Sequence, residues 1–448
     1  MVKVFTRKNR LSEARILALG FAIVILLGGV ILSLPISSKS GRYTSLVDSI
    51  FTATSAVCVT GLVTLDTGTY WNVFGQCVIM VLIEIGGLGF MSITTFIAML
   101  LGKKITLRDR LIMQEAMNTF DIQGLVKMLR YILGFTFMVQ IIGAILLSIV
   151  FIPQFGLSTG IFYSIFHSIS AFCNAGFDLF GNFSSLTGFS GNYLVITVIG
   201  LLIIIGGLGF AVLIEILNYR NIKKLSVHSK IVLCVTICLI FGGALSIFLV
   251  EYRNDATLGN LNFGEKILNS LFASITPRTA GFNSISTDDM TMSGKLITII
   301  LMFIGGSPGS TAGGIKTATF GVLVLTVVSV LKGRNDTEAF GRRFSKETVY
   351  KAFTLFAIGM AIVLIVTMIL SVTEPDQQFI NILYEASSAF GTAGLTTGVT
   401  QEVGTLSKFV LMFTMYCGRV GPITVFLAIL KRNKNSGIRY PEGKILIG

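Results

Sequence analysis

The fold is decided by the stretch Ser388-Ala-Phe-Gly-Thr-Ala-Gly394-Leu, because three similar stretches precede it along the chain. They are Ser55-Ala-Val-Cys-Val-Thr-Gly61-Leu, Ser170-Ala-Phe-Cys-Asn-Ala-Gly176-Phe and Ser274-Ile-Thr-Pro-Arg-Thr-Ala-Gly281-Phe, the last with one additional residue between its serine and its glycine. Their glycines recur at near-equal intervals. Recurrence at a fixed period is the signature of internal repeats, so the chain is predicted to contain four related units.

Each glycine stretch has the same neighbours. A long apolar run precedes it, at residues 15–35, 131–153, 231–250 and 349–372. A short, partly polar run leads into it, at residues 45–55, 159–170, 263–274 and 379–388. Another long apolar run follows, at residues 71–101, 192–218, 296–331 and 406–430. Because a helix needs about 20 residues to cross a bilayer, each unit predicts a spanning helix, a short half-helix, a glycine segment and a second spanning helix.

The composition is that of a membrane protein. Hydrophobic residues make up 53% of the chain, charged residues only 13%, and the mean hydropathy is +0.81. A soluble domain carries about 25% charged residues. The first apolar run follows several basic residues, as in a signal peptide, but it is longer than such a peptide and no small-residue cleavage site follows it. It is therefore expected to be a retained first helix.

The net charge of +13 is concentrated in particular loops. Most lysines and arginines fall in five segments, at residues 3–15, 103–130, 220–230, 332–351 and 431–444. Positive loops face the cytoplasm, so both termini are expected there, in a multi-pass protein of the plasma membrane. The charge then reports topology and contact with anionic lipid, and no nucleic-acid partner is expected.

Enzyme chemistry is not expected. None of the six cysteines forms a CxxC pair, and the two histidines form no HExxH motif, which argues against a zinc site or a membrane protease. A distant alternative is a transporter of an organic solute built on inverted repeats. The four units here all run in the same sense, which fits a pore with pseudo-fourfold symmetry better.

Four re-entrant glycine segments should form a cation path. Irregular backbone survives at membrane depth only when it is buried in protein or lines water, so the four segments must converge on one axis. The C-terminal end of each short helix carries partial negative charge that favours a cation, and backbone carbonyls can replace the hydration shell of the ion. Glycine supplies backbone angles that other residues avoid. The segment from Thr279 to Phe282 aligns with the first four residues of the TVGYG filter of potassium channels.

The predicted fold is an all-α integral membrane protein, with eight transmembrane helices in four helix–pore-helix–helix repeats around a pseudo-fourfold pore. The predicted filter residues, which would bind potassium, are Val59, Thr60, Gly61, Asn174, Ala175, Gly176, Thr279, Ala280, Gly281, Thr392, Ala393 and Gly394. The alternative, that such glycines only mediate helix packing, suits the segments 86–90 and 206–210 inside long apolar runs. Those two segments are expected to be packing or bending sites. Glu385, in the fourth short helix, is expected to hydrogen-bond backbone around the filter.

The expected domain organisation follows the repeats. Repeat 1 covers residues 1–101, repeat 2 residues 102–219 with a cytoplasmic connector at 102–130, repeat 3 residues 220–331 and repeat 4 residues 332–430, and a cytoplasmic tail occupies 431–448.

The third repeat departs from the others in its second apolar run. The stretch Gly305-Gly-Ser-Pro-Gly-Ser-Thr-Ala-Gly-Gly-Ile-Lys316 contains five glycines and a proline, so it cannot be a regular helix. A broken helix at membrane depth must line a cavity. Residues 304–317 are therefore predicted to form an intramembrane gate loop that obstructs the path, with a plain kink as the alternative. The predicted gate residues in this stretch are Gly305, Gly306, Ser307, Pro308, Gly309, Gly313, Gly314 and Lys316.

Arg419 lies inside the last apolar run, where a charge is costly and marks a functional candidate. Facing the path, it would repel cations from an occluded cavity or bind carbonyl groups of the gate loop. The alternative is that its side chain extends to the cytoplasm, and an interfacial position remains equally open for Lys316.

The four segments, their spacing and the helix layout resemble the Trk/Ktr/HKT superfamily of potassium transporters over residues 15–430. Within it the chain is most similar to the membrane subunits of Ktr-type systems, because extra leading helices and a Gly-x-Gly-x-x-Gly nucleotide-binding module are both absent. The resemblance implies a homodimer with one pore in each protomer. It also implies that the dimer is bound to a cytosolic ring of separate RCK subunits, which bind a regulatory nucleotide. Glycine at all four filter positions implies potassium as the transported ion. Alternatives are a sodium-coupled symporter, with Na⁺ as activator or coupling ion, and a sodium-permeable transporter. The resemblance also implies contact between Arg419 and the gate loop.

Overall fold

The computed structural model describes residues 13–89, 125–218 and 225–429, a few isolated positions between 91 and 114, and residue 441. Most of the expected connector at 102–130, most of the basic segment at 3–15, and all but one residue of the tail at 431–448 lie outside the described residues.

Four long helices begin the four repeats. They are α1 (Glu13–Ser33), α7 (Leu125–Phe155), α11 (Val227–Glu251) and α15 (Lys346–Thr373). Each is long and apolar enough to cross a membrane, and each exposes large apolar side chains, among them Leu27, Ile145, Leu249 and Met368. Exposed apolar faces on four helices fit contact with lipid. Serine hydroxyls cap the first turns of α11 and α15, which fixes where these two helices begin.

Four short helices follow the long ones, as the sequence predicts. They are α2 (Leu46–Val57), α8 (Leu157–Cys173), α12 (Phe263–Ile275) and α16 (Phe379–Gly391). The last two turns of each are buried, and each ends directly before a glycine segment. Every short helix therefore directs its C-terminal end toward the protein interior.

The second helix of each repeat is interrupted. These helices are α4 (Val73–Leu88), α9 (Tyr193–Gly207) with α10 (Phe210–Asn218), α13 (Met292–Phe303) with α14 (Thr317–Leu331), and α18 (Thr405–Val420) with α19 (Pro422–Ile429). At each interruption a glycine has a positive φ, namely Gly89 (81°), Gly209 (88°), Gly309 (67°) and Gly421 (94°). A glycine in this conformation ends the helical hydrogen-bond pattern.

The predicted count of eight transmembrane helices is not confirmed by helix length. Within the described residues four helices are individually long enough to span, or five if α9 and α10, bent by 101°, are taken as one span. The sequence predicted an interruption only in repeat 3, because only there do glycines and a proline accumulate.

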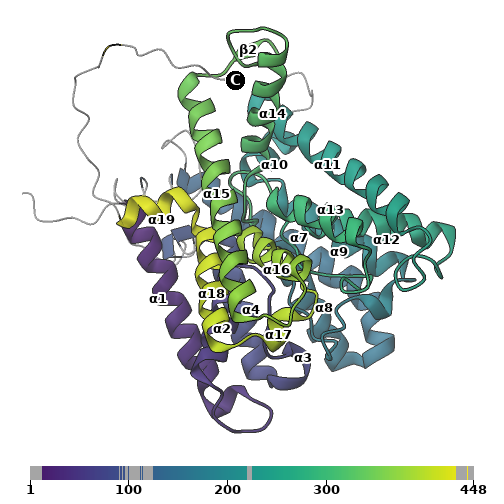
Figure 1. Ribbon diagram of the computed structural model, residues 1–448. Coiled ribbons are helices and arrows are strands. Elements are labelled where there is room, and N and C mark those ends of the chain that lie inside the picture. Colours follow the sequence, from purple (N-terminus) through teal and green to yellow (C-terminus); the bar gives the residue numbers. More distant parts are fainter. Residues whose placement is uncertain are drawn as a thin grey trace, which may run out of the picture.

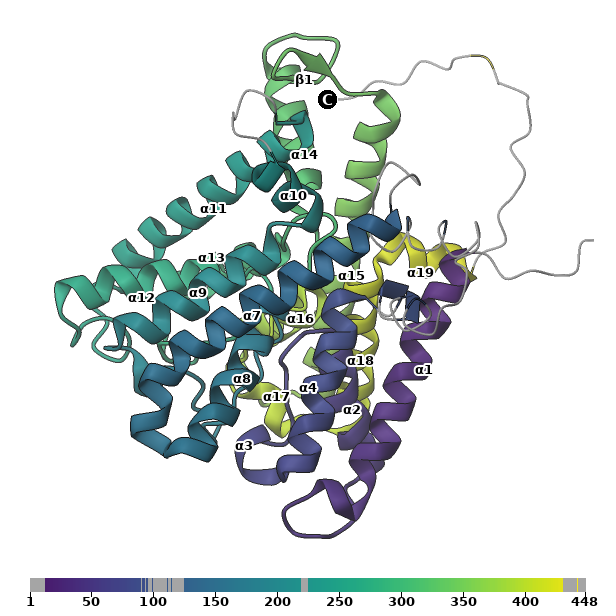
Figure 2. The same cartoon turned by 180° about the vertical axis from the view of Figure 1, so that it is seen from behind.

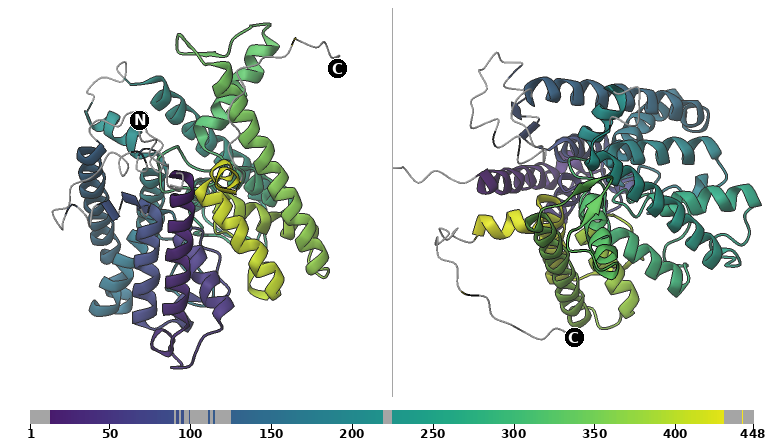
Figure 3. Two further views of the ribbon diagram at one scale, coloured as in Figure 1. Left: turned by 90° about the vertical axis from the view of Figure 1, so that its left-hand side faces the viewer. Right: turned by 90° about the horizontal axis from the view of Figure 1, so that it is seen from above.

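The repeats surround a common centre, with the short helices inside and the long helices outside (Figure 1, Figure 2). The first and last described helices, α1 and α19, pack against each other, and α18 packs against α2, so repeat 4 closes onto repeat 1. Seen from above, the long helices radiate from this centre (Figure 3). One apolar cluster runs through all four repeats and forms the core.

Several small elements lie at the two ends of the helix assembly. The short helices α3 (Thr67–Tyr70) and α17 (Val399–Glu402) lie at one end, and the hairpin of β1 (Glu338–Ala339) and β2 (Arg342–Arg343) lies at the other (Figure 1). Two single-turn 3₁₀ helices, η1 (Pro35–Ser37) and η2 (Thr187–Phe189), belong to connecting loops. The hairpin, in the connection between α14 and α15, is a small departure from the all-α prediction.

Candidate functional site

The four filter glycines form a closed ring. A Cβ atom added to Gly61 would lie 2.6 Å from the carbonyl oxygen of Ala175, next to Gly176. A Cβ on Gly176 would lie 2.7 Å from a carbonyl oxygen of repeat 3, and a Cβ on Gly281 would lie 3.0 Å from a carbonyl oxygen of repeat 4. A Cβ on Gly394 would overlap with a carbonyl oxygen of repeat 1. The structure thus brings together four segments that are far apart in sequence, and it leaves no room for a side chain at any of the four positions.

Two positions in every filter segment adopt left-handed backbone. The glycines have φ values of 96°, 69°, 80° and 79° in chain order. The residues two positions earlier are also left-handed, namely Val59 (56°), Asn174 (61°), Thr279 (80°) and Thr392 (50°). Three of these are β-branched residues, for which positive φ is strained and persists only where the surroundings impose it. Sequence reasoning assigned unusual backbone to the glycines alone and missed the earlier position.

Each filter segment is tied back to its own short helix by a backbone hydrogen bond. The amides of Thr60, Ala175 and Ala393 donate to the carbonyls of Ser55, Ser170 and Ser388, each at 2.8 Å. In repeat 3 the amide of Ala280 donates to the carbonyl of Thr276 at 2.9 Å.

Thr276 therefore fills the serine position of repeat 3, and the alignment that placed Ser274 there is wrong. The hydroxyl of Ser274 instead donates to the carbonyl of Ile240 in α11. The hydroxyl of Thr276 donates to the carbonyl of Phe282, which is the same bond that Ser170 makes to Phe177 in repeat 2.

Three filter hydroxyls have no hydrogen-bond partner although they are buried. They belong to Thr60, Thr279 and Thr392. Buried polar groups are usually paired, and an unpaired one often marks a ligand site. The hydroxyl of Thr392 lies against Gly313 of the gate loop.

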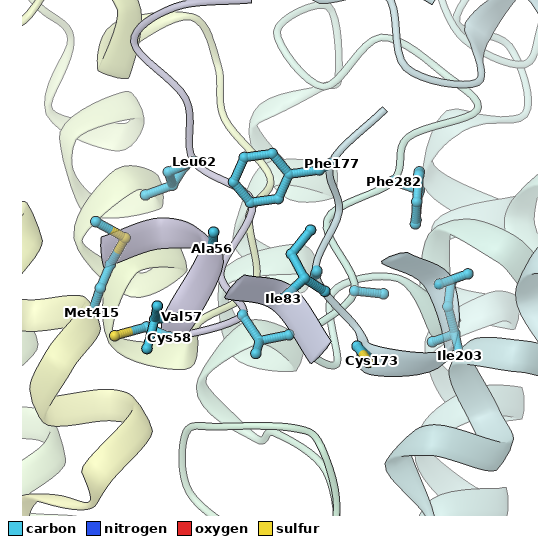
Figure 4. Close-up of a cluster of buried hydrophobic side chains, with 14 of the residues drawn as sticks. Ala56, Val57, Cys58, Leu62, Ile83, Cys173, Phe177, Ile203, Phe282 and Met415 are labelled. Carbon is cyan, nitrogen blue, oxygen red and sulfur yellow. The ribbon is translucent and has the colours of Figure 1, made fainter. Parts of the chain in front are cut away.

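The surroundings of the ring are largely apolar. The residues that follow three of the filter glycines, Leu62, Phe177 and Phe282, are fully buried in the cluster drawn in Figure 4. Val57 and Cys173, from the ends of α2 and α8, lie in the same cluster (Figure 4). Polar atoms are therefore confined to the ring and to the residues that bond to it, and the apolar packing around the ring holds it rigidly.

Glu385 supports the outer end of the fourth filter. Its buried carboxylate accepts hydrogen bonds from the amide of Thr397 at 3.1 Å and from the hydroxyls of Thr396 and Thr400. This geometry is the one the sequence suggested for Glu385. His167 has a similar position in repeat 2: its Nδ1 donates to the carbonyl of Tyr163 at 2.7 Å, so its Nε2 accepts from the amide of Leu179.

The predicted gate loop is an irregular segment pressed against repeat 2. The amide of Ser307 donates to the carbonyl of Gly207 at 3.0 Å, and the amide of Phe210 donates to the carbonyl of Gly309 at 2.9 Å. The hydroxyl of Thr311 donates to the carbonyls of Phe172 and Gly206.

The loop also reaches the filter itself. A Cβ on Gly313 would overlap with the hydroxyl of Thr392, and a Cβ on Gly305 would lie 3.3 Å from the methyl group of Thr279. The other predicted gate residues, Gly306, Pro308 and Gly314, lie in the same segment. The loop therefore lies directly against filters 3 and 4.

Arg419 connects three repeats beneath the ring. Its guanidinium donates to the carbonyl of Thr311 in the gate loop and to the carbonyls of Gly86 and Gly87, the latter at 3.1 Å. Within the described part of the chain it forms no ion pair with an acidic residue. Lys316 donates to the carbonyl of Ala312 within the loop. Two cationic side chains thus bind carbonyl groups of the predicted gate loop.

The segment 86–90, expected to serve packing or bending only, also supplies carbonyl groups to Arg419. A shared spacing could have indicated this role. A glycine precedes each left-handed glycine of the second helices by three positions, at Gly86, Gly206, Gly306 and Gly418. In repeats 1, 2 and 4 a Cβ on this glycine would overlap with a carbonyl oxygen at the end of the short helix of the same repeat. The four interruptions are thus a second fourfold feature, below the filter.

Comparison with known proteins is consistent with this geometry. A family model described as a cation transport protein, TrkH, matches residues 21–438. The potassium/sodium uptake protein NtpJ of Enterococcus hirae is 47% identical over 98% of both chains. The Ktr system potassium uptake protein B of Bacillus subtilis is 42% identical, over 98% of this chain and 97% of that protein.

Among solved structures, the potassium transporter TrkH from Vibrio parahaemolyticus is similar in fold. The TM-score is 0.74 at 17% sequence identity, and the match covers 96% of this chain and 86% of the other.

Proposed function

Because the chain belongs to the TrkH family of cation transport proteins, we propose that it takes up potassium ions across the plasma membrane through its four filter segments. The observation that carries the proposal is the closed ring of Gly61, Gly176, Gly281 and Gly394, each packed against the next repeat. A ring of backbone oxygens can replace the hydration shell of a cation. The family model that matches the chain is described as a cation transport protein, which favours an ion as the substrate.

Potassium is the preferred ion of this proposal. The relatives from Enterococcus hirae and Bacillus subtilis are both named as potassium uptake proteins. All four filters have glycine at the third position, which the superfamily resemblance associates with potassium. The name of the Enterococcus protein also includes sodium, so sodium as an activator or coupling ion is the second candidate.

We further propose that the structure represents a closed pore. The loop 304–317 lies against filters 3 and 4, and two positive charges, Arg419 and Lys316, lie near it. A fixed positive charge in a site of low dielectric repels a cation strongly. Opening would require the loop to leave Thr392 and the carbonyl of Thr311 to leave Arg419.

The proposed control acts from the cytoplasm. The basic loops, which contain the β1–β2 hairpin, would face the cytoplasm together with both termini. A homodimer would present these loops to a ring of RCK-type subunits, and the nucleotide would act only through that ring. The sequence proposes four repeats, at residues 1–101, 102–219, 220–331 and 332–430. These repeats would then share one filter, and the opening of the pore would be regulated through the third and fourth repeats.

Uptake of radioactive rubidium into vesicles containing the purified chain tests the proposal. We expect saturable uptake that potassium suppresses much more strongly than sodium does. The variant Gly61→Ser should lower uptake sharply, because its side chain would lie 2.6 Å from the carbonyl oxygen of Ala175 at a positive φ. Absence of rubidium uptake by a folded chain would overturn the proposed function. A chain lacking residues 306–313 tests the gate separately. Its uptake should become independent of any cytosolic partner. Uptake that the partner still regulates as in the wild type would refute a gating role.

A further inference from the structure

The gate loop is bound to repeat 2 by more hydrogen bonds than to repeat 4. These bonds join the loop to residues 206–210, the break between α9 and α10, which is here called the repeat-2 seat. Three of them are backbone bonds, in which Ser307 donates to Gly207 at 3.0 Å, Thr311 donates to Gly206 at 3.3 Å, and Phe210 donates to Gly309 at 2.9 Å. Among the described residues, the one bond from repeat 4 to the loop is that from Arg419 to Thr311. The repeat-2 seat is therefore the main anchor of the loop outside repeat 3.

The backbone of the repeat-2 seat fits the gate loop closely. Gly209 has a φ of 88°, and a Cβ added to it would lie 2.6 Å from the carbonyl oxygen of Pro308. The break in repeat 4 has a glycine in the same conformation, Gly421, with a φ of 94°. A Cβ there would make only an ordinary contact, 3.7 Å from the hydroxyl oxygen of Thr424. The conformation of the break is thus common to both repeats, whereas close contact with the loop is specific to repeat 2.

Thr311 joins the loop to two repeats at once. Its amide donates to the carbonyl of Gly206, and its hydroxyl is shared between that carbonyl, at 3.1 Å, and the carbonyl of Phe172, at 3.3 Å. Its own carbonyl accepts from Arg419. Phe172 lies in the last turn of α8, which ends at filter 2, and carbonyls at that end of a helix carry the partial negative charge that favours a cation. Thr311 therefore also covers one of the carbonyl groups next to filter 2.

The helix α10 connects the repeat-2 seat to the end of the molecule that carries the hairpin (Figure 2). Its first amide, that of Phe210, belongs to the group of N-terminal amides that have no partner within a helix, and the gate loop supplies the partner. Near its other end, Glu215 accepts from the amide of Ser226, the residue before α11, at 3.0 Å. The helix is bent by 101° from α9. A rotation of α10 about this bend would therefore withdraw the amide of Phe210 from the loop.

We propose that the repeat-2 seat is the latch that holds the gate loop closed, and that rotation of α10 releases it. The inference rests on the proposed function, because it assumes that the loop obstructs a cation path. Opening then requires the loop to leave repeat 2 as well as Arg419, so both contacts bias one closed–open equilibrium. A cytosolic partner that binds the basic segment 220–230 would act on the gate through α10 without touching the loop.

Replacing Thr311 by valine tests the latch. Valine keeps the shape of threonine but removes the hydroxyl that binds the carbonyls of Gly206 and Phe172. Because the closed state loses a hydrogen bond, rubidium uptake by the chain alone should rise about threefold or more. Thr311→Ser keeps the hydroxyl and loses the methyl group, so it should restore wild-type uptake. A side chain that served packing alone would give the opposite order of the two variants.

Replacing Gly209 by alanine tests the close contact between the repeat-2 seat and the loop. The added Cβ would displace Pro308, so uptake should rise as in Thr311→Val. Gly421→Ala is the matched control, because it places the same side chain at the same left-handed φ but away from the loop. Its uptake should stay close to that of the wild type. If Gly209→Ala does not fold, the two Thr311 variants still decide the question.

Hydrogen exchange followed by mass spectrometry separates the latch from the proposed function. In the full chain in detergent, the amides of Phe210 and Ser307 should exchange slowly, and Thr311→Val should speed the exchange of both. Arg419→Met opens the gate through a different contact. It should also speed exchange at Phe210, because the loop must leave the repeat-2 seat when the pore opens.

Two results would overturn the latch. One is raised uptake by Arg419→Met with unchanged exchange at Phe210, and the other is wild-type uptake by both Thr311→Val and Gly209→Ala. Faster exchange at Phe210 and Ser307 in these variants, without rubidium uptake by any of them or by the wild type, would support the latch and count against the proposed function alone.

Discussion

Replacing Arg419 by methionine should raise rubidium uptake by the chain alone about tenfold or more. Methionine keeps the apolar stem of the side chain but removes the charge and all donors. In the closed structure Arg419 donates to Thr311 of the gate loop and to Gly86 and Gly87 of α4. Only the bond to Thr311 must break when the loop moves. A hydrogen bond from a charged group contributes about 1.5–3 kcal/mol, so losing it shifts the closed–open equilibrium about tenfold or more toward the open state.

The assay is initial uptake of radioactive rubidium into vesicles without any cytosolic partner, normalised to inserted protein. Arg419→Lys is the matched control. It keeps the positive charge but cannot reach three carbonyl groups at once, so it should fall between wild type and Arg419→Met. If lysine restores wild-type uptake completely, electrostatic repulsion and not the tether closes the pore. If the methionine variant is folded and its uptake does not exceed that of the wild type, the assignment of Arg419 as a closing contact is refuted.

Three further predictions concern the filter and its outer mouth. Gly394→Ala should abolish uptake, because its Cβ would overlap with a carbonyl oxygen of repeat 1. Gly41 also has a positive φ but borders open space. Gly41→Ala should therefore keep uptake and lose only about 1–2 kcal/mol of folding stability. Thermal unfolding and rubidium uptake of both variants test this, and equal loss of uptake would contradict it. Ser170→Ala should impair selectivity over sodium because a buried bond to the filter is lost, while Ser388→Ala, which removes an unpartnered hydroxyl, should not. A sodium-competition assay separates the two, and identical behaviour would be the contrary result. Burial raises the pKa of Asp178, in the outer loop after filter 2, to about 7. The carboxyl is therefore mostly neutral below that pH and ionised above it, so uptake at low rubidium should increase between about pH 6 and pH 8. Asp178→Asn should flatten this profile, and an unchanged profile would exclude the carboxyl.

The repeat pattern predicted the outer features of the fold well. The short helices, the long first helices and the positions of the filter segments all follow from apolar run length and from four similar stretches at regular spacing. These are local properties, since run length decides whether a segment can cross a bilayer and a glycine readily adopts the left-handed backbone of the third filter position. The apolar composition likewise determines that the chain belongs in a membrane.

The interruptions of the second helices were predicted only in part. In repeat 3 glycines and Pro308 are dense enough to exclude a helix by themselves. In repeats 1 and 2 the apolar run continues across the break, and its composition would also suit an unbroken helix, whereas in repeat 4 Gly421 and Pro422 mark the break. The break arises because Gly86, Gly206 and Gly418 let a short-helix carbonyl approach the second helix more closely than any side chain would allow. That approach is a contact between segments distant in sequence.

By itself, then, the sequence determined a membrane protein of four repeats with a glycine filter, because those properties depend on composition and on local backbone preference. Only the tertiary structure decided which carbonyl groups Arg419 binds and that loops of three repeats line one cavity. These features depend on the distance between groups that are up to hundreds of residues apart in the chain. Such distances are fixed by the packing of the four repeats into one ring, and no local pattern encodes them.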